Sequence, residues 1–206
     1  MADLITGDIL IEHDADTPRP IASISKLTTI LTAFELKLPV GDLVYPLLLE
    51  SNNEAAEQIS KLTYRTSFIK YMNDYVARLG MMHTHYSDPS GLSSRNVSSA
   101  SDLLILARHL FGEHRDILDL TLVQDHGDYE NSNLFVKARD SDYLGGKSGY
   151  TPEAGGTLLS IFDLPLAGGM SRPIVVIVLG TDSNKEVKYE LVRTLNDYLL
   201  KYVTYR

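Results

Sequence analysis

Residues 20–37 read PIASISKLTTILTAFELK. Apolar side chains recur there at helical spacing, which predicts a helix over Ala22–Lys37. Ser23 and Lys26 are three residues apart, so their hydroxyl and amine share one face of that helix. A serine hydroxyl becomes a nucleophile when a neighbouring base takes its proton, and a lysine can be that base if burial or another cation lowers its pKa. The stretch therefore predicts a Ser–Lys pair at the start of a helix, with Lys147 as the expected second cation.

Two further short motifs follow, in the order Ser51-Asn52-Asn53 and Lys147-Ser148-Gly149. The first two patterns each recur, as Ser67-Phe68-Ile69-Lys70 and as Ser94-Arg95-Asn96, whereas the third occurs once. Any one copy in isolation is better explained by a helix-capping serine and a solvated lysine. The indication of function therefore comes from the order and surroundings of the three motifs, not from any one of them.

The segments around these motifs place strands at the two ends of the chain and helices in the middle. Strands are predicted within Asp3–Glu12, Thr157–Phe162 and Ile174–Gly180. Helices are predicted over Leu43–Leu49 with Asp42 as its N-cap, and over Glu54–Leu62, Ser67–Leu79, Ser101–Phe111 and Glu186–Tyr202. Residues 112–142 follow no clear pattern. The expected fold class is α/β of the α+β kind, with terminal segments sharing one antiparallel sheet.

Composition excludes several classes of protein. The 206 residues carry 19 basic and 27 acidic side chains, a net charge of −8, which disfavours nucleic acid as a partner. The chain has no cysteine, so thiolate metal sites and cysteine nucleophiles are excluded. His83 and His85 lack a third ligand at sensible spacing, and no metal or other cofactor is expected. No apolar run is long enough to span a bilayer, and no signal peptide precedes Asp3.

The three ordered motifs and their flanks resemble the serine penicillin-binding proteins, specifically the low-molecular-mass D-alanyl-D-alanine carboxypeptidases. Similar flanks include Pro20-Ile21-Ala22 before the nucleophile, Gly91-Leu92, and the run from Lys147 to Gly155. The resemblance covers nearly the whole chain. It implies a β-lactamase/transpeptidase-like fold in a single domain 1–206, with a sheet lobe of about 1–20 and 135–206 and a helical lobe of about 21–134.

The resemblance also implies a role for each site residue. Ser23 is the expected nucleophile, Lys26 its general base, Ser51 a proton relay to the leaving amine, and Asn53 a ligand of both the substrate amide and Lys26. Lys147 is expected to keep Lys26 neutral by its positive charge. The remaining roles are an oxyanion hole from the backbone N–H groups of Ser23 and Tyr150, close approach of the strand at Gly149, and substrate contacts from Ser148, Thr151 and Lys188.

Two features depart from the family pattern. Only 28 residues separate Ser23 from Ser51. In the family this connection is usually much longer. With so short a connection, we expect the site to assemble only if the two intervening helices cross at an angle. The family often has an arginine for the substrate carboxylate, where this chain has Lys185 and Lys188, Lys188 being the better positional match. A lysine offers a point charge instead of a planar fork.

The expected function is therefore a serine carboxypeptidase that acts on peptidoglycan stem peptides ending in D-Ala-D-Ala and is acylated by β-lactams. A DD-endopeptidase, a serine β-lactamase and a catalytically silent scaffold stay open as alternatives. No glutamate has an asparagine four residues later, which counts against the β-lactamase. The resemblance implies an extracytoplasmic protein that is near the membrane without entering it, and we expect a monomer.

Overall fold

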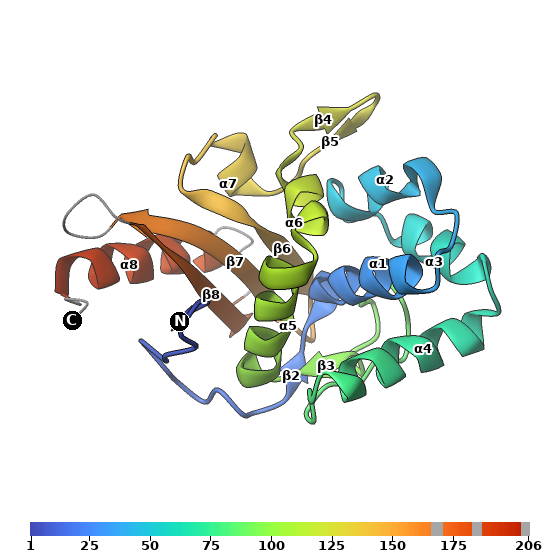
Figure 1. Cartoon of the computed structure of the whole chain (residues 1–206), viewed down its shortest axis with the longest axis horizontal. Coiled ribbons are helices and arrows are strands. Elements are labelled where there is room, and N and C mark those ends of the chain that lie inside the picture. Colours follow the sequence, from blue (N-terminus) through green and yellow to red (C-terminus); the bar gives the residue numbers. More distant parts are fainter. Residues whose placement is uncertain (166–170, 183–186, 203–206) are drawn as a thin grey trace.

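The computed structural model describes residues 1–165, 171–182 and 187–202, and within them one antiparallel sheet carries helices on both faces (Figure 1). Its strand order is β1-β8-β7-β6, from Ala2–Asp3, Ser171–Thr181, Gly155–Pro165 and Tyr143–Thr151. The sheet thus joins the two ends of the chain, and the predicted fold class is confirmed. The proposed boundaries of a sheet lobe and a helical lobe stay a prediction.

The alternation of side chains along the strands builds two cores. In β7, Leu159 and Ile161 face the cluster formed with the central helices, while Leu158 and Phe162 face a second cluster. The period of two along a strand sends successive residues to opposite faces of the sheet. Helix α8, Val187–Tyr202, covers the second face and supplies Val192 and Leu199.

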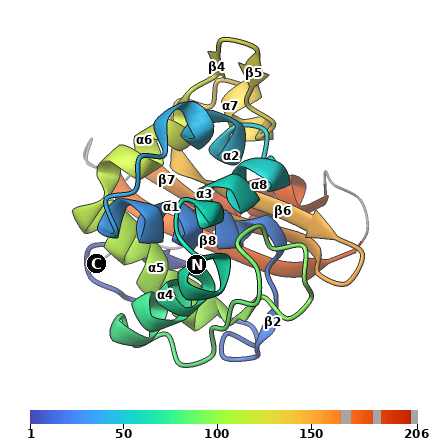
Figure 2. The same ribbon diagram turned by 90° about the vertical axis from the view of Figure 1, so that its right-hand side faces the viewer.

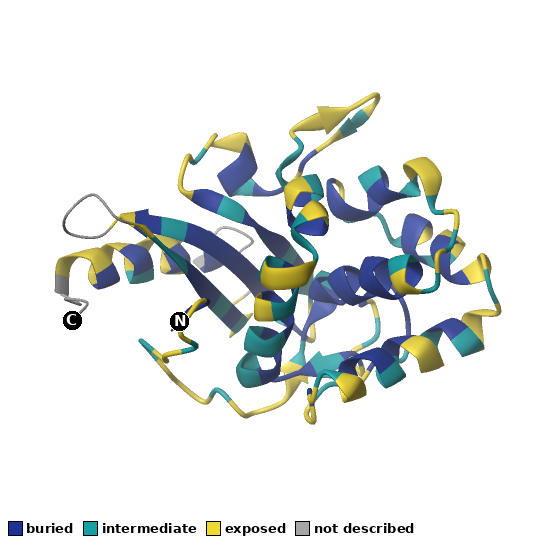
Figure 3. Cartoon of the chain, viewed as in Figure 1, coloured by how far each residue is buried: buried dark blue, intermediate teal, exposed yellow. Residues whose placement is uncertain are grey.

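The other face of the sheet carries the remaining long helices. Helix α5, Ala100–Glu113, and helix α6, Arg115–Leu122, pack on β8 and β6. Figure 2 shows α2, Val44–Leu48, α3, Asn53–Lys61, and α4, Arg65–Arg78, gathered around α1, Ser25–Glu35. Figure 3 shows that α1 is buried along almost its whole length. Because α1 is central, even its polar residues Thr28, Thr29 and Thr32 are buried.

Short elements complete the described chain. They are the 3₁₀ turns η1, Ala22–Ile24, and η2, Gly41–Leu43, the strand pair β2, Arg19–Pro20, and β3, Val97–Ser98, the hairpin β4, Asp125–His126, and β5, Tyr129–Glu130, and helix α7, Leu134–Lys137. No helix in these residues has the length and apolarity needed to cross a bilayer.

Two local predictions were wrong. The expected strand pair over Asp3–Glu12 reduces to β1 and a single bridge between Ala2 and Ile9. The cause is the buried Asp3 carboxylate, which accepts hydrogen bonds from the backbone of Ile5 and Thr6 and so closes a turn. Asp42 is not an N-cap, because it lies inside the turn η2.

Candidate active site

Ser23 lies in the 3₁₀ turn that leads from the sheet into α1. The turn η1 packs against β6 and β7, and its neighbours Ile21 and Ile24 are fully buried. Ala22 adopts a φ of 47°, an unusual backbone conformation for a residue with a Cβ atom. The serine thus opens into a cleft of about 460 Å³ between β6 and the helices. The residues lining it are Ser23, Glu50, Ser51, Asn53, Gly91, Leu92, Ser132, Leu134, Ser148, Gly149, Tyr150, Thr151, Lys188 and Tyr189.

Lys26 lies directly behind Ser23 and is fully buried. Its Nζ atom donates to Ser23 Oγ at 2.9 Å, to Asn53 Oδ1 at 2.7 Å and to the Ser90 carbonyl oxygen at 2.7 Å. Burial lowers the pKa of Lys26 to about 7, although the charge of Asp88 acts in the opposite direction. A large fraction of this lysine is therefore neutral at physiological pH.

Asn53 and Ser51 reach the cleft in spite of the short connection from α1. Residues 36–49 fold back over α1 through η2 and α2, and α3 then begins beside α1. Asn52 is the N-cap of α3 and accepts from the Ala55 N–H at 3.0 Å. The first two motifs are therefore brought together in spite of the short connection, because Asn53 Oδ1 lies 2.7 Å from Lys26 Nζ and Ser51 lines the same cleft as Ser23.

Ser51 lies between α2 and α3, and no hydrogen bond holds its side chain among the described residues. Its φ is 63°, and its buried Oγ atom has no hydrogen-bond partner among the residues that the structure describes. Ser51 Oγ therefore lines the cleft without contacting the Ser23–Lys26 pair through a hydrogen bond.

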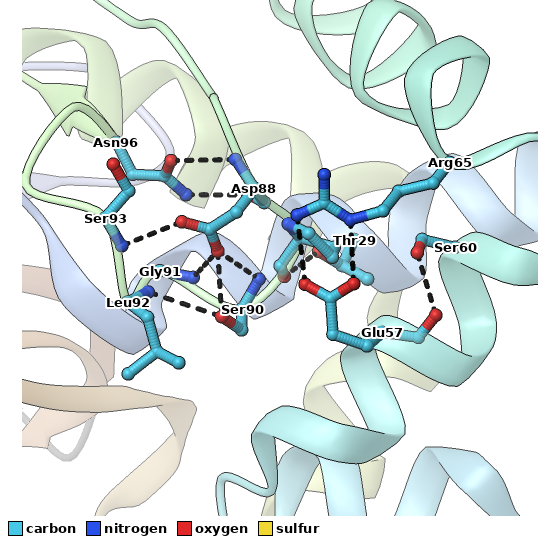
Figure 4. A network of polar contacts seen from close by, with 11 residues as sticks. Thr29, Glu57, Ser60, Arg65, Asp88, Ser90, Gly91, Leu92, Ser93 and Asn96 are labelled. Atoms are coloured by element: carbon cyan, nitrogen blue, oxygen red, sulfur yellow. Dashed lines mark hydrogen bonds and ion pairs between the residues drawn. The ribbon is translucent and has the colours of Figure 1, made fainter.

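The loop formed by residues 88–96, drawn in Figure 4, contributes the Ser90 carbonyl to the surroundings of Lys26. The Asp88 carboxylate accepts from the N–H groups of Ser90, Gly91 and Ser93 and from Ser90 Oγ. Burial raises the pKa of Asp88, but these hydrogen bonds outweigh that effect and lower it. These hydrogen bonds fix a tight turn that directs the Ser90 carbonyl at Lys26, a contribution that the sequence analysis did not identify.

Asn96 fastens the same loop to α1. Its Nδ2 donates to Ser25 Oγ at 3.1 Å and to the Asp88 carbonyl at 2.8 Å, and its Oδ1 accepts from the Ser87 and Asp88 N–H groups. Thr29 adds a bond to the Pro89 carbonyl at 2.6 Å. The loop and helix α1 therefore hold each other in place around Lys26.

Strand β6 forms the opposite wall and carries Ser148, Gly149, Tyr150 and Thr151. A Cβ atom at Gly149 would lie 2.6 Å from Ser23 N and 2.7 Å from Thr157 Oγ1. Only glycine lets the strand come this close to the nucleophile. Ser23 and the backbone of β6 consequently face the same small volume.

Lys147 and Lys188 are both buried at strand β6. Lys147 is buried behind the cleft, and its Nζ donates to the Ser148 carbonyl at 3.0 Å. Its pKa is lowered well below the usual value by burial, and then by the charges of Lys26 and Lys188. Burial is the largest cause of the lowered pKa of Lys26, and the expected role of Lys147 stays a prediction. Lys188 lines the cleft and donates to the Gly149 carbonyl at 2.6 Å.

The cleft holds no grouping of metal ligands among the described residues. The histidine and carboxylate side chains that do converge, His109, Glu113 and His114, lie elsewhere, and His83 and His85 are not among them.

Comparison with known proteins identifies the family. The family model for D-alanyl-D-alanine carboxypeptidases matches residues 30–182, a stretch that holds the second and third motifs and begins after Ser23 and Lys26. A D-alanyl-D-alanine endopeptidase of Haemophilus influenzae is 31% identical over 198 residues, covering 77% of this chain and 68% of that protein. The D-alanyl-D-alanine carboxypeptidase DacD of Escherichia coli is 26% identical over 156 residues, covering 72% of this chain and 39% of that protein.

Comparison with solved structures points to the same family. Penicillin-binding protein D2 of Listeria monocytogenes, in its cefotaxime-bound form, superposes with a TM-score of 0.82 at 27% identity and covers 95% of this chain and 93% of that one. The same protein in its ampicillin-bound form gives the same values. The chain described here belongs to the D-alanyl-D-alanine carboxypeptidase family.

Proposed function

We propose that this chain is a serine D-Ala-D-Ala carboxypeptidase whose nucleophile is Ser23 and whose general base is Lys26. The observation that carries the proposal is the set of three atoms around Lys26 Nζ. A neutral amine has two N–H donors and one lone pair. The Asn53 and Ser90 oxygens accept the two donors, so the lone pair is directed at Ser23 Oγ, 2.9 Å away.

The reaction then runs in two steps. Lys26 takes the hydroxyl proton while Ser23 Oγ bonds to the carbonyl carbon of the penultimate D-alanine, and the amide C–N bond breaks as the leaving amine receives a proton. Ser51 is among the residues that line the cleft, and its buried hydroxyl is the proposed relay for that proton. A water molecule then attacks the ester, with Lys26 as base, and regenerates Ser23.

Substrate binding follows from the wall formed by β6. The backbone N–H groups of Ser23 and Tyr150 are the proposed oxyanion hole, because Gly149 brings the strand against Ser23 N. Ser148, Thr151 and Lys188 line the same cleft and are proposed to bind the terminal carboxylate. Lys147 supports the strand through its bond to the Ser148 carbonyl.

A β-lactam offers Ser23 a strained amide of similar shape, and we propose that it forms a slowly hydrolysed ester there. The substrate is the peptidoglycan stem peptide, so the proposed place of action is outside the cytoplasmic membrane, by a monomeric protein.

The test is release of D-alanine from a synthetic stem pentapeptide by the wild-type chain and by Ser23→Ala. The proposal expects release that depends on Ser23. A cross-linked peptide dimer tests the endopeptidase alternative, which the Haemophilus influenzae relative favours. A β-lactam adduct without cleavage of either peptide would instead indicate the silent scaffold.

A further inference from the structure

A second cluster of polar side chains lies where α5 ends and α6 begins (Figure 1). One ligand-type atom from each of His109, Glu113 and His114 lies within 4.8 Å of the other two. These side chains are remote from the cleft around Ser23. His109 and His114 border a separate hollow at the end of α1, next to Glu35, about 16 Å along the helix from its start.

The local backbone explains how the three side chains converge. His109 and Glu113 are four residues apart on one face of α5, with His109 Nδ1 and a Glu113 carboxylate oxygen 3.4 Å apart. In a continued helix His114 would point about 140° away from His109. Instead its φ of −132° and ψ of 47° end the helix, and its ring lies edge-on to that of His109 with centroids 4.7 Å apart.

The second nitrogen of His109 is held by α4. Tyr75 Oη lies 2.7 Å from His109 Nε2, which fixes the orientation of the ring and leaves Nδ1 facing Glu113. A hydrogen bond at the non-coordinating nitrogen is a regular feature of histidine ligands of metals.

Helix ends of both kinds meet at the cluster, because His114 ends α5 and is also the N-cap of α6, whose N-terminus disfavours a cation. The C-terminal ends of α1, α4 and α5 border the hollow, and carbonyl groups at helix C-termini favour positive charge. Arg78 also borders it, but its guanidinium pairs with the Glu35 carboxylate and lies over the Tyr75 ring. The Glu113 side chain is 72% exposed, which leaves an entry path and room for a water ligand.

We propose that His109, Glu113 and His114 bind a divalent transition-metal ion of the Zn²⁺ type. Two imidazoles, one carboxylate and one water are a four-ligand set that Zn²⁺ accepts. Ligand atoms about 2.0–2.1 Å from a tetrahedral ion lie about 3.4 Å apart, which is the observed separation of His109 Nδ1 and the Glu113 oxygen. The ion would brace the α5–α6 junction and, through Tyr75, helix α4, without taking part in acyl transfer.

The experiment is calorimetric titration of the chelator-treated full-length chain with Zn²⁺ alone, followed by the visible absorption spectrum of the Co²⁺ form. We expect one ion per chain and the strong absorption of tetrahedral Co²⁺. Glu113→Gln and His114→Ala should each weaken binding at least about tenfold, and Tyr75→Phe, which removes no ligand, by about 10–100-fold. His85→Ala, at an exposed histidine outside the cluster, is the matched control and should bind like the wild type.

Glu113→Gln keeps the test decisive, because this exposed side chain can change without disturbing the core. Circular dichroism and thermal unfolding establish that each variant is folded. No Zn²⁺ binding by the folded wild type would overturn the proposal. Equal binding by the wild type, Glu113→Gln and His114→Ala would overturn it as well.

Discussion

Ser23-Ile24-Ser25-Lys26 and Ser67-Phe68-Ile69-Lys70 share one spacing, yet their surroundings differ. Lys26 is fully buried on the central helix α1 and contacts Ser23, Asn53 and the Ser90 carbonyl. Lys70 lies on the peripheral helix α4, where its side chain is 72% exposed and pairs with Asp74 one turn on. The spacing brings the two groups to one face, whereas burial and hydrogen-bond acceptors from other segments make the lysine a base.

The two Ser-x-Asn copies differ in a related way. Asn53 points its oxygen at Lys26 from the start of α3. Asn96 is fully buried, and its side chain forms hydrogen bonds with Ser25, Ser87 and Asp88. Asn53 therefore contacts the proposed base directly, whereas Asn96 holds the loop that surrounds the base.

The largest effect should come from replacing Lys26, the lysine of the first Ser-x-x-Lys copy. Lys26→Met removes the base and should slow acylation by benzylpenicillin by about 10²–10⁴-fold. Lys70→Met, the matched control, should leave the rate unchanged because Lys70 is remote from the cleft. Stopped-flow or mass-resolved acylation rates measure both, and equal losses in the two variants would contradict the assignment of the base.

Gly149→Ala should come next in size. The added Cβ would meet Ser23 N and Thr157 Oγ1, so β6 must move away from the nucleophile. We expect a loss of about 10²–10³-fold in acylation, the size typical of a lost oxyanion-hole donor.

Gly112→Ala is the control for Gly149→Ala. Gly112 lies in α5 with nothing within 4 Å of an added Cβ. It should stabilise the fold by about 0.5–1 kcal/mol, by urea unfolding, and leave acylation unchanged. A Gly149→Ala variant that acylates at the wild-type rate would refute the close approach of β6.

Asn96→Ala should chiefly affect stability. The substitution leaves the backbone N–H groups of Ser87 and Asp88 without their acceptor, which costs about 1–3 kcal/mol of unfolding free energy. Asn53→Ala, in the other Ser-x-Asn copy, should instead lower the acylation rate with a smaller change in stability. Urea unfolding and acylation rates of the two variants separate these effects, and an exchange of the two outcomes would refute the comparison.

The pH dependence should reflect the pKa of Lys26. The base must be neutral, and burial lowers its pKa to about 7, so acylation should rise with pH and level off above that value. Below it, the rate should fall by about tenfold per pH unit. A profile that keeps rising up to pH 10 would show that Lys26 has the pKa of an exposed lysine.

Sequence patterns predicted β7, β8 and most helices, but β6, which contains three glycines, was not predicted as a strand. Helix α3 was expected over Glu54–Leu62 and spans Asn53–Lys61, and α8 was expected over Glu186–Tyr202 and spans Val187–Tyr202. Residues 112–142 were not resolved by pattern, because α6, the hairpin β4–β5 and α7 are too short for periodicity to emerge. Asp42 was wrongly predicted as an N-cap because aspartate is favoured both in turns and at helix N-caps.

The site was predictable only where it depends on side chains in ordered motifs. The motifs pointed to Ser23, Lys26 and Asn53, which the structure brings into contact. The contribution of Ser90 is a backbone carbonyl, which leaves no signature in the sequence. Asp88-Pro89-Ser90-Gly91 could have suggested a rigid turn, but nothing in it shows that the turn faces Lys26.

The most direct test of this account is intact-mass spectrometry after incubation with benzylpenicillin, comparing the wild type, Ser23→Ala and Ser67→Ala. The account predicts one adduct of penicillin mass on the wild type and on Ser67→Ala, and none on Ser23→Ala. An adduct that persists on Ser23→Ala, or none on the folded wild type, would contradict the claim that Ser23 is the activated nucleophile.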